Sequence, residues 1–117
     1  MKDYQAITTD VSDYLAEMRK LAPGVLAGFG DMAKAATVSG ALDEKTKELI
    51  ALAIGVADRC DGCIGFHARA LVRLGATRAE LAETLGVAVY MGGGPSLMYA
   101  ADALRAFDQF THEATKG

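Results

Sequence analysis

The sequence predicts an all-α fold of six helices, and three observations lead to that prediction. Apolar residues recur every three or four positions across residues 10–21, which is the spacing of an amphipathic helix. Helix caps and breaks follow one another along the chain, among them a Thr-Arg-Ala-Glu capping box at residues 77–80 and a glycine-rich break at residues 92–95. No segment shows the alternation of a convincing strand. We expect these helices to form one domain over residues 1–117.

Length and composition exclude several classes of function. A chain of 117 residues supports one hydrophobic core but not two. With 51% hydrophobic and 23% charged residues and a net charge of -3, the chain is not disordered and has no basic footprint for nucleic acid. The longest apolar run, residues 49–57, is far short of the ~20 residues that span a bilayer, so no membrane partner is expected.

The N-terminus and the cysteines predict the cellular compartment of the protein. The first ten residues are polar and acidic, unlike a secretory signal. Two cysteines without an export signal argue for a reducing compartment, in which a C-x-x-C pair is more often catalytic or metal-binding than structural. We therefore expect a cytoplasmic protein.

Three helices are expected in the part of the sequence that precedes the cysteines. Asp10 is the expected cap of a helix over residues 10–21, and Pro23 ends it. A second helix begins beside Pro23 and carries an apolar series of Val25, Leu26, Phe29, Met32 and Ala33. Asp43 caps a third helix whose residues 49–57 are apolar on nearly every side, so that this helix should be central and buried.

Three further helices follow short breaks. The fourth runs from about residue 60 to 74 and ends at Gly75, which suits a left-handed C-cap. The capping box at residues 77–80 opens the fifth helix, and Pro95 is well placed in the first turn of the sixth. The sixth helix is expected to end near residue 110, before a fraying tail. Its apolar perimeter fits either core packing or a surface buried against other subunits.

The chemistry-bearing residues lie in the stretch from Glu48 to His67. Cys60 and Cys63 are the only cysteines, and His67 follows them in the pattern C-x-x-C-x-x-x-H. With Cys60 at a helix start, all three side chains share one face, and the cysteine Cα atoms lie ~5–6 Å apart, within reach of a disulfide. Free N–H groups of the first turn and the helix dipole favour the thiolate, and the imidazole can accept a proton. This pattern indicates a nucleophilic thiol with a resolving partner.

Other interpretations of the same residues stay open. The cysteines could be two buried small apolar residues, or could bind zinc with His67, in which case Glu48 would have to be the fourth ligand. A thioredoxin-like site is excluded, because the chain lacks the βαβ context. Gly62 and Gly65 fit either the approach of a small oxidant or close helix packing.

Glu48 receives little support from periodicity alone. It lies twelve residues before Cys60, on a different expected helix, so helical spacing cannot bring it to the cysteines. A tight turn at residues 58–59 could fold the two helices together without determining their separation. On residue pattern alone, Glu48 is better explained as a solvated residue of the first helical turn.

The stretch from Leu42 to about Gly86 resembles the alkylhydroperoxidase AhpD-like branch of the carboxymuconolactone decarboxylase superfamily. The matching pieces are L-D-E-K-T-K-E-L-I, C-x-x-C-x-x-x-H and L-G-A-T-x-x-E-L, in the order and spacing of that family. They cover over a third of the chain. The flanks, residues 1–38 and 92–117, match only in length and helical character.

The resemblance implies an all-α subunit of a homotrimer or homohexamer and a cofactor-free thiol peroxidase or disulfide reductase. It implies that Cys63 is the peroxidatic thiol, that Cys60 resolves it, and that His67 and Glu48 form the proton relay. The implied partners are a hydroperoxide substrate and a dithiol or protein reductant. Well-known members carry a further histidine where this chain has Gly62, which leaves the implied relay with one imidazole.

Two rival functions remain from the sequence. One is a metal-binding or thiol-sensing module, in which oxidation alters assembly without turnover. The other is a decarboxylase or lyase on the same scaffold, although muconolactone-decarboxylating members generally lack the cysteine pair. The identity of the hydroperoxide and of the reductant is not written in the sequence.

Overall fold

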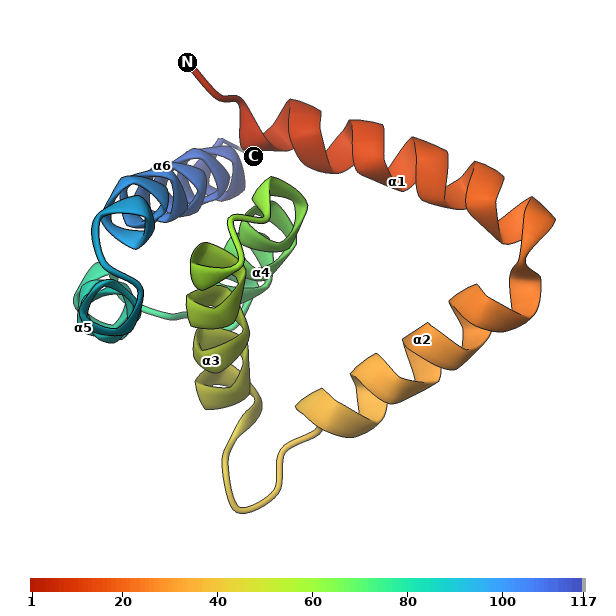
Figure 1. The fold of residues 1–117 in the computed structure, drawn as a ribbon, viewed down its shortest axis with the longest axis horizontal. Helices are drawn as coiled ribbons and strands as arrows, with labels where there is room; N and C mark the ends of the chain where they lie inside the picture. Colours follow the sequence, from red (N-terminus) through yellow and green to blue (C-terminus); the bar gives the residue numbers. More distant parts are fainter. Residues whose placement is uncertain (117) are drawn as a thin grey trace.

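Six helices and the turns between them make up the part of the protein that the structure describes. The computed structural model describes residues 1–116, and no strand occurs in this range. The helices are α1 (Tyr4–Leu21), α2 (Pro23–Thr37), α3 (Glu44–Ala57), α4 (Asp61–Arg73), α5 (Arg78–Gly92) and α6 (Gly94–Thr115), as Figure 1 shows. The expected all-α class and the number of helices are confirmed. No helix in the described part of the chain is long and apolar enough to cross a membrane.

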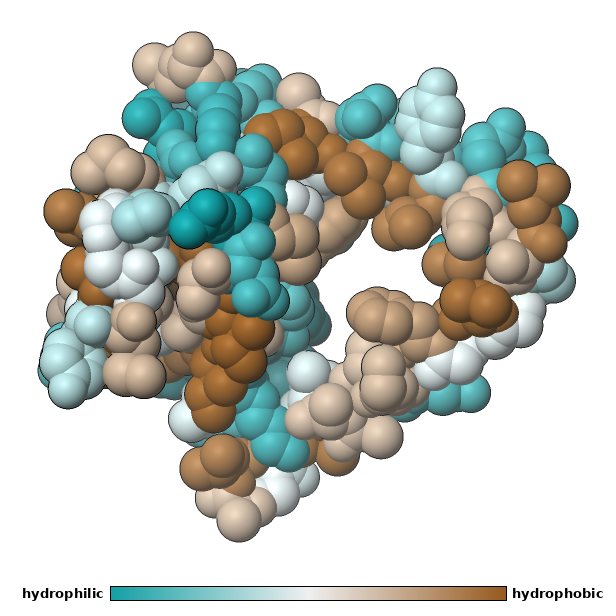
Figure 2. All heavy atoms as spheres, viewed as in Figure 1, coloured by the Kyte–Doolittle hydropathy of each residue, from teal (hydrophilic) through white to brown (hydrophobic). Residues whose placement is uncertain are grey.

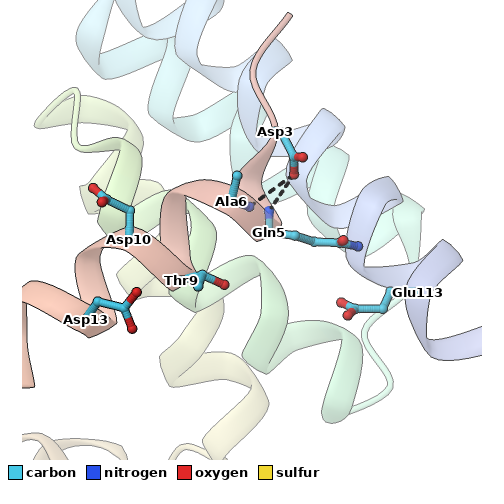
Figure 3. A pocket seen from close by; sticks show the side chains of 7 residues that line it. All are labelled: Asp3, Gln5, Ala6, Thr9, Asp10, Asp13 and Glu113. Atoms are coloured by element: carbon cyan, nitrogen blue, oxygen red, sulfur yellow. Dashed lines mark hydrogen bonds between the residues drawn. The ribbon is translucent and has the colours of Figure 1, made fainter.

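The start of α1 differs from the expectation. Asp3, not Asp10, is the N-cap, and its carboxylate accepts the backbone N–H groups of Gln5 and Ala6 (Figure 3). Both aspartates suit a cap by type, but only the earlier start buries Tyr4 completely. Asp10 instead lies within the helix and, with Asp13, on the edge of an acidic surface pocket.

Helices α3, α4, α5 and α6 pack together as the body of the molecule, and α1 and α2 form an arm that projects from it (Figure 1). The N-terminal part of α1 packs on α4 and α6, where Tyr4 and Thr8 are buried. Helix α2 contacts only α1 and α3 in the described structure and buries no residue. Apolar side chains of the arm therefore face an opening between arm and body (Figure 2).

Helix α3 is central but only partly buried, which corrects the expectation that it is enclosed on all sides. Leu52 and Val56 are fully buried in the core, whereas Ile50 and Ile54 are 45% and 56% exposed. The exposed face borders α5 and forms an apolar groove with Val87. The apolar perimeter of α3 thus marks a second exposed surface rather than complete burial.

Local signals determined most of the remaining boundaries. Asp43 caps α3, the Thr77–Glu80 capping box opens α5, and Gly75 follows α4 with a φ of 77°, all as predicted. Helix α6 continues to Thr115 instead of ending near residue 110. Phe107 and Phe110 are buried against the body, and residues 111–115 extend the helix beyond them as exposed turns. The expected helix end near residue 110 is therefore wrong, and residue 117 of the expected fraying tail, residues 111–117, lies outside the described residues.

Candidate functional site

Cys60 and Cys63 lie at the beginning of α4 and are joined by a disulfide. Cys60 is the N-cap residue, and its sulfur accepts the backbone N–H of Cys63 at 3.2 Å. The Cα atoms are 5.2 Å apart, as the spacing predicted. The turn that leads into the pair is closed by Arg59, in the left-handed region at φ 56°, and by a hydrogen bond from Cys60 N–H to the carbonyl of Gly55.

Gly55 allows α3 to approach the cysteine pair closely. A Cβ atom at this position would lie 3.0 Å from the Cβ of Cys63, closer than ordinary van der Waals contact. The sequence interpretation missed Gly55. The available signal was a lone glycine inside an otherwise apolar helix, which often marks such an approach.

His67 and Glu48 meet across the contact between α4 and α3. The Nδ1 atom of His67 is 2.6 Å from the carboxylate of Glu48, and Glu48 is only 7% exposed. The residue pattern had favoured a solvated Glu48, and this expectation is wrong because the turn after α3 folds α4 directly against it. The carboxylate of Glu48 accepts a hydrogen bond from Nδ1–H of His67 in the tautomer that leaves Nε2 as a proton acceptor.

A cavity of about 510 Å³ lies beside the disulfide, between α4 and the arm. His67 is the only charge-bearing side chain among the residues that line it; the others are Val11, Leu15, Phe29, Ala33, Cys60, Gly62, Cys63 and Phe66. The sequence interpretation read the arm residues of this set as packing residues only. Helical periodicity does identify their apolar stripes, but it cannot show that the stripes face the cysteines.

A second cavity, of about 460 Å³, also borders His67 and has charged side chains in its wall. It is lined by Glu48, Phe66, His67, Arg69, Ala70 and Arg73. Arg69 stacks on the ring of Phe66, 5.1 Å from its centroid. His67 therefore lines both an apolar cavity beside the cysteines and a mixed cavity bordered by two arginines.

The two glycines of the motif have different roles. A Cβ at Gly65 would lie 2.6 Å from Cγ2 of the buried Thr8 and 3.3 Å from the ring of Tyr4, so Gly65 permits close packing of α4 on α1. A Cβ at Gly62 would meet only Cγ2 of Val11, at an ordinary 3.8 Å, and Gly62 borders the apolar cavity. Close packing thus explains Gly65, while Gly62 leaves space beside the sulfurs.

Asp61, between the cysteines, is held by the N-terminal segment. Its Oδ1 accepts hydrogen bonds from Nζ of Lys2 at 3.0 Å and from the hydroxyl of Tyr4 at 2.7 Å. Burial, and then the bond to Asp61, raise the pKa of Tyr4 far above its usual value. The pKa of Lys2 is also raised, mainly by its hydrogen bond to Asp102. The sequence interpretation missed these residues, which are separated by more than fifty positions and share no motif.

A metal centre receives no support from the arrangement. No group of three or more His, Cys, Asp or Glu residues among positions 1–116 is placed to hold a metal ion. Glu48, the fourth ligand that zinc would have needed, is bound to Nδ1 of His67, and the two sulfurs are bound to each other.

The profile of the carboxymuconolactone decarboxylase family matches residues 23–106, which includes the whole C-x-x-C-x-x-x-H stretch. The chain belongs to the carboxymuconolactone decarboxylase family. The resemblance seen in the sequence is thereby confirmed at the level of the superfamily, and the match extends well beyond the motif pieces into α2 and α6.

Solved structures of carboxymuconolactone decarboxylase family proteins share the fold. A Legionella pneumophila member, in its apo form, is 61% identical, with a TM-score of 0.90 over 92% of this chain and 96% of that one. A Thermotoga maritima member, for which an involvement in the antioxidative response has been suggested, is 27% identical, with a TM-score of 0.83 over 94% of each chain.

Curated relatives extend the family likeness. An uncharacterised protein of Cupriavidus necator is 40% identical over 91% of this chain and 94% of its own length. An uncharacterised Paracoccus denitrificans protein from the cox locus is 33% identical over 81% of this chain and 86% of its own length. Family membership and the disulfide together fit a redox role.

Proposed function

We propose that this family member is a thiol-dependent peroxidase that reduces organic hydroperoxides and is recycled by a dithiol. One observation carries the proposal. A cysteine pair able to form a disulfide begins α4 and shares a cavity with His67, whose other face is bound to the buried Glu48. This arrangement supplies a nucleophile, a resolving thiol and a proton acceptor within one site.

The first step oxidises Cys63. Its thiolate attacks the terminal oxygen of the hydroperoxide, the O–O bond breaks, and the alcohol leaves with a proton, while the sulfur becomes a sulfenic acid. Imidazole Nε2 of His67 takes the proton from the Cys63 thiol and returns it to the leaving oxygen. Glu48 stabilises the imidazolium that forms in between, as a carboxylate bound to Nδ1 does.

The second and third steps restore the dithiol. Cys60 attacks the sulfenic sulfur, water leaves, and the Cys60–Cys63 disulfide forms. The backbone N–H of Cys63 lies 3.2 Å from the Cys60 sulfur, so the first turn of α4 offers the resolving sulfur a hydrogen-bond donor. An external dithiol then reduces the pair by two thiol–disulfide exchanges and is itself oxidised to a disulfide, so that two electrons balance the reaction.

The apolar cavity supports an organic rather than a small polar hydroperoxide. Its walls are formed by aliphatic and aromatic side chains of α1, α2 and α4, and His67 is its one titratable group apart from the cysteines. Burial of apolar substrate surface contributes about 25 cal/mol per Å². We expect organic hydroperoxides to oxidise the pair faster than hydrogen peroxide does.

Serine variants test the assignment of the two thiols. Cys60→Ser should lose one thiol in a single fast turnover with an organic hydroperoxide and then stop, because no disulfide can form. Cys63→Ser should lose both the fast turnover and recycling. Thiol counting on metal-free reduced protein, seconds after one equivalent of hydroperoxide, measures both. An equal loss of the first turnover in the two variants contradicts the assignment.

The outcomes also separate the rival functions. Oxidation of both thiols that no dithiol reverses would support a thiol sensor instead. Persistence of both thiols in excess hydroperoxide would exclude the peroxidase. Turnover of a carboxylated small molecule by the Cys60→Ser/Cys63→Ser double variant would support a decarboxylase or lyase.

We also propose that the protein works as a homotrimer or homohexamer. The arm exposes a row of large apolar side chains, each at least 40% exposed in the described chain, namely Tyr14, Leu15, Met18, Leu21, Val25, Phe29 and Met32. Contiguous apolar patches of this kind are typical of subunit interfaces.

A further inference from the structure

Asp61 is a carboxylate that lies between the two cysteines in the sequence, and side chains of the N-terminal segment hold it in place. It is the first residue of α4, directly after Cys60. The ammonium group of Lys2 and the hydroxyl of Tyr4 both bind its Oδ1 atom. These partners lie 59 and 57 positions away in the sequence, so the fold, not local helix geometry, directs this carboxylate.

The restraining groups are themselves held in place. Nζ of Lys2 also binds Oδ2 of Asp102 at 2.8 Å and lies 4.8 Å from the ring centroid of Tyr99, both on α6. The side chain of Gln109 binds the backbone on both sides, accepting from Tyr4 N–H at 2.8 Å and donating to the carbonyl of Lys2 at 2.9 Å. The N-terminal segment is thus fastened to α6 at a fixed distance from the start of α4.

An unrestrained Asp61 would work against a thiolate at this site. Carboxylates in the first turn of a helix are attracted to its free N–H groups and to the positive end of its dipole. Here the Cys60 sulfur has the capping role, because it accepts the N–H of Cys63. A free carboxylate one residue away would compete for these donors and repel the charge of a thiolate.

Stabilisation of the thiolate determines how readily the disulfide is reduced. Reduction by glutathione breaks the Cys60–Cys63 bond, transfers two electrons from two glutathione thiols, and produces glutathione disulfide and the dithiol. Any group that stabilises the thiolate of the product shifts this equilibrium towards reduction and raises the reduction potential.

We propose that Lys2 is a positioning residue that raises the reduction potential of the Cys60–Cys63 pair by restraining and neutralising Asp61. The proposal rests on the redox function proposed above. It extends that function to the N-terminal segment, which binds Asp61. Lys2 acts through Asp61, and Tyr4 supports the same position of the carboxylate.

Equilibration of the intact protein in glutathione buffers of stated ratio tests the proposal without any hydroperoxide. Lys2→Met should lower the equilibrium constant for reduction about fivefold, which corresponds to ~20 mV for a two-electron couple. Lys2→Arg, which keeps the charge, should stay within twofold of the parent protein. Lys20→Met makes the same change of charge at an exposed residue paired only with Glu17 in the arm, and should also stay within twofold.

A double variant shows whether Lys2 acts through Asp61. In an Asp61→Asn background, Lys2→Met should change the equilibrium constant by less than twofold, because the carboxylate that Lys2 restrains is absent. A full fivefold effect in that background would overturn the proposal, as would equal shifts in Lys2→Met and Lys2→Arg or no shift in Lys2→Met.

The two proposals fail in distinguishable ways. If the parent protein equilibrates reversibly with glutathione and Lys2→Met does not differ from it, the role of Lys2 is wrong while the redox function stands. If hydroperoxide fails to oxidise the thiols but Lys2→Met shifts the equilibrium as expected, the peroxidase function is wrong and the role of Lys2 stands.

Discussion

Glu48 and His67 form a pair whose effect on the thiols can be measured one residue at a time. The carboxylate of Glu48 is nearly buried and 2.6 Å from Nδ1 of His67. Glu48→Gln keeps the size of the side chain but removes the charge that stabilises an imidazolium. Hydrogen-bond partners that orient metal-bound histidines typically contribute 10–100-fold to affinity or activity, and Glu48 orients His67 through the same kind of bond. We expect Glu48→Gln to slow the first oxidation of Cys63 about 30-fold, as measured by stopped-flow thiol loss with an organic hydroperoxide.

The control for this variant lies one turn earlier on α3. Glu44→Gln makes the same change at a carboxylate that is 3.7 Å from exposed Arg73 and should leave the rate within twofold of the parent protein. In a His67→Asn background, Glu48→Gln should have no further effect, since its action passes through the imidazole. An undiminished effect in that background would contradict the relay.

The sequence predicted the parts of the site that depend on local spacing. Cys60, Cys63 and His67 share a helical face because they are three and four positions apart, and no tertiary information is needed. Glu48 came only from family resemblance, because its contact with His67 depends on how α3 and α4 pack. The bond between Lys2 and Asp61 joins residues 59 positions apart, and no pattern in one sequence indicates such a pair.

At the scale of helices, Gly65 controls the contact between α4 and α1. A methyl group there would overlap Thr8, whose hydroxyl binds the carbonyls of Tyr4 and Gln5 and whose side chain cannot turn away without losing those bonds. Overpacking costs about 1–3 kcal/mol, and alanine regains up to ~1 kcal/mol of helix propensity. We expect Gly65→Ala to lower the free energy of unfolding by about 1–2 kcal/mol, measured by urea denaturation.

Gly62→Ala is the matched control within the same helix. Its new methyl group would meet Val11 at an ordinary distance, so only the gain in helix propensity, at most ~1 kcal/mol, should remain. Gly62→Ala should therefore be neutral or slightly stabilising. If the two variants lost equal stability, close packing at Gly65 would not be the reason for its glycine.

Helix boundaries were predictable wherever a local signal was unique. Asp43, the capping box and Gly75 each had no competitor nearby, and all three were right. The predicted start of α1 was wrong because tertiary burial decides it, whereas α6 runs past its predicted end through residues 111–115, which are exposed. Tyr4 is buried in the body and holds the first turn of α1, which the local pattern left undefined.

At the scale of the whole molecule, the arm is the feature that a lone subunit explains least well. Helix α2 has no buried residue, although it carries large apolar side chains. Val25, Phe29 and Met32 are each more than 60% exposed. The apolar cavity beside the cysteines also takes part of its wall from the arm. Sequence periodicity predicted the apolar stripe of α2, but it could not distinguish a stripe that faces the chain's own core from one that is left for another subunit.

Met32→Asp tests whether the arm is covered by further copies of this chain. The parent protein, with a subunit mass of 12.2 kDa, should elute as a trimer or hexamer at micromolar concentration in size-exclusion chromatography with light scattering. A carboxylate buried without a partner in an apolar contact is strongly unfavourable, so Met32→Asp should weaken assembly at least tenfold. Ala41→Asp adds the same charge in the exposed connection between α2 and α3 and should leave the mass unchanged. A monomeric parent protein would contradict the proposed assembly, because the apolar face of the arm would then stay open to solvent without a second copy to cover it.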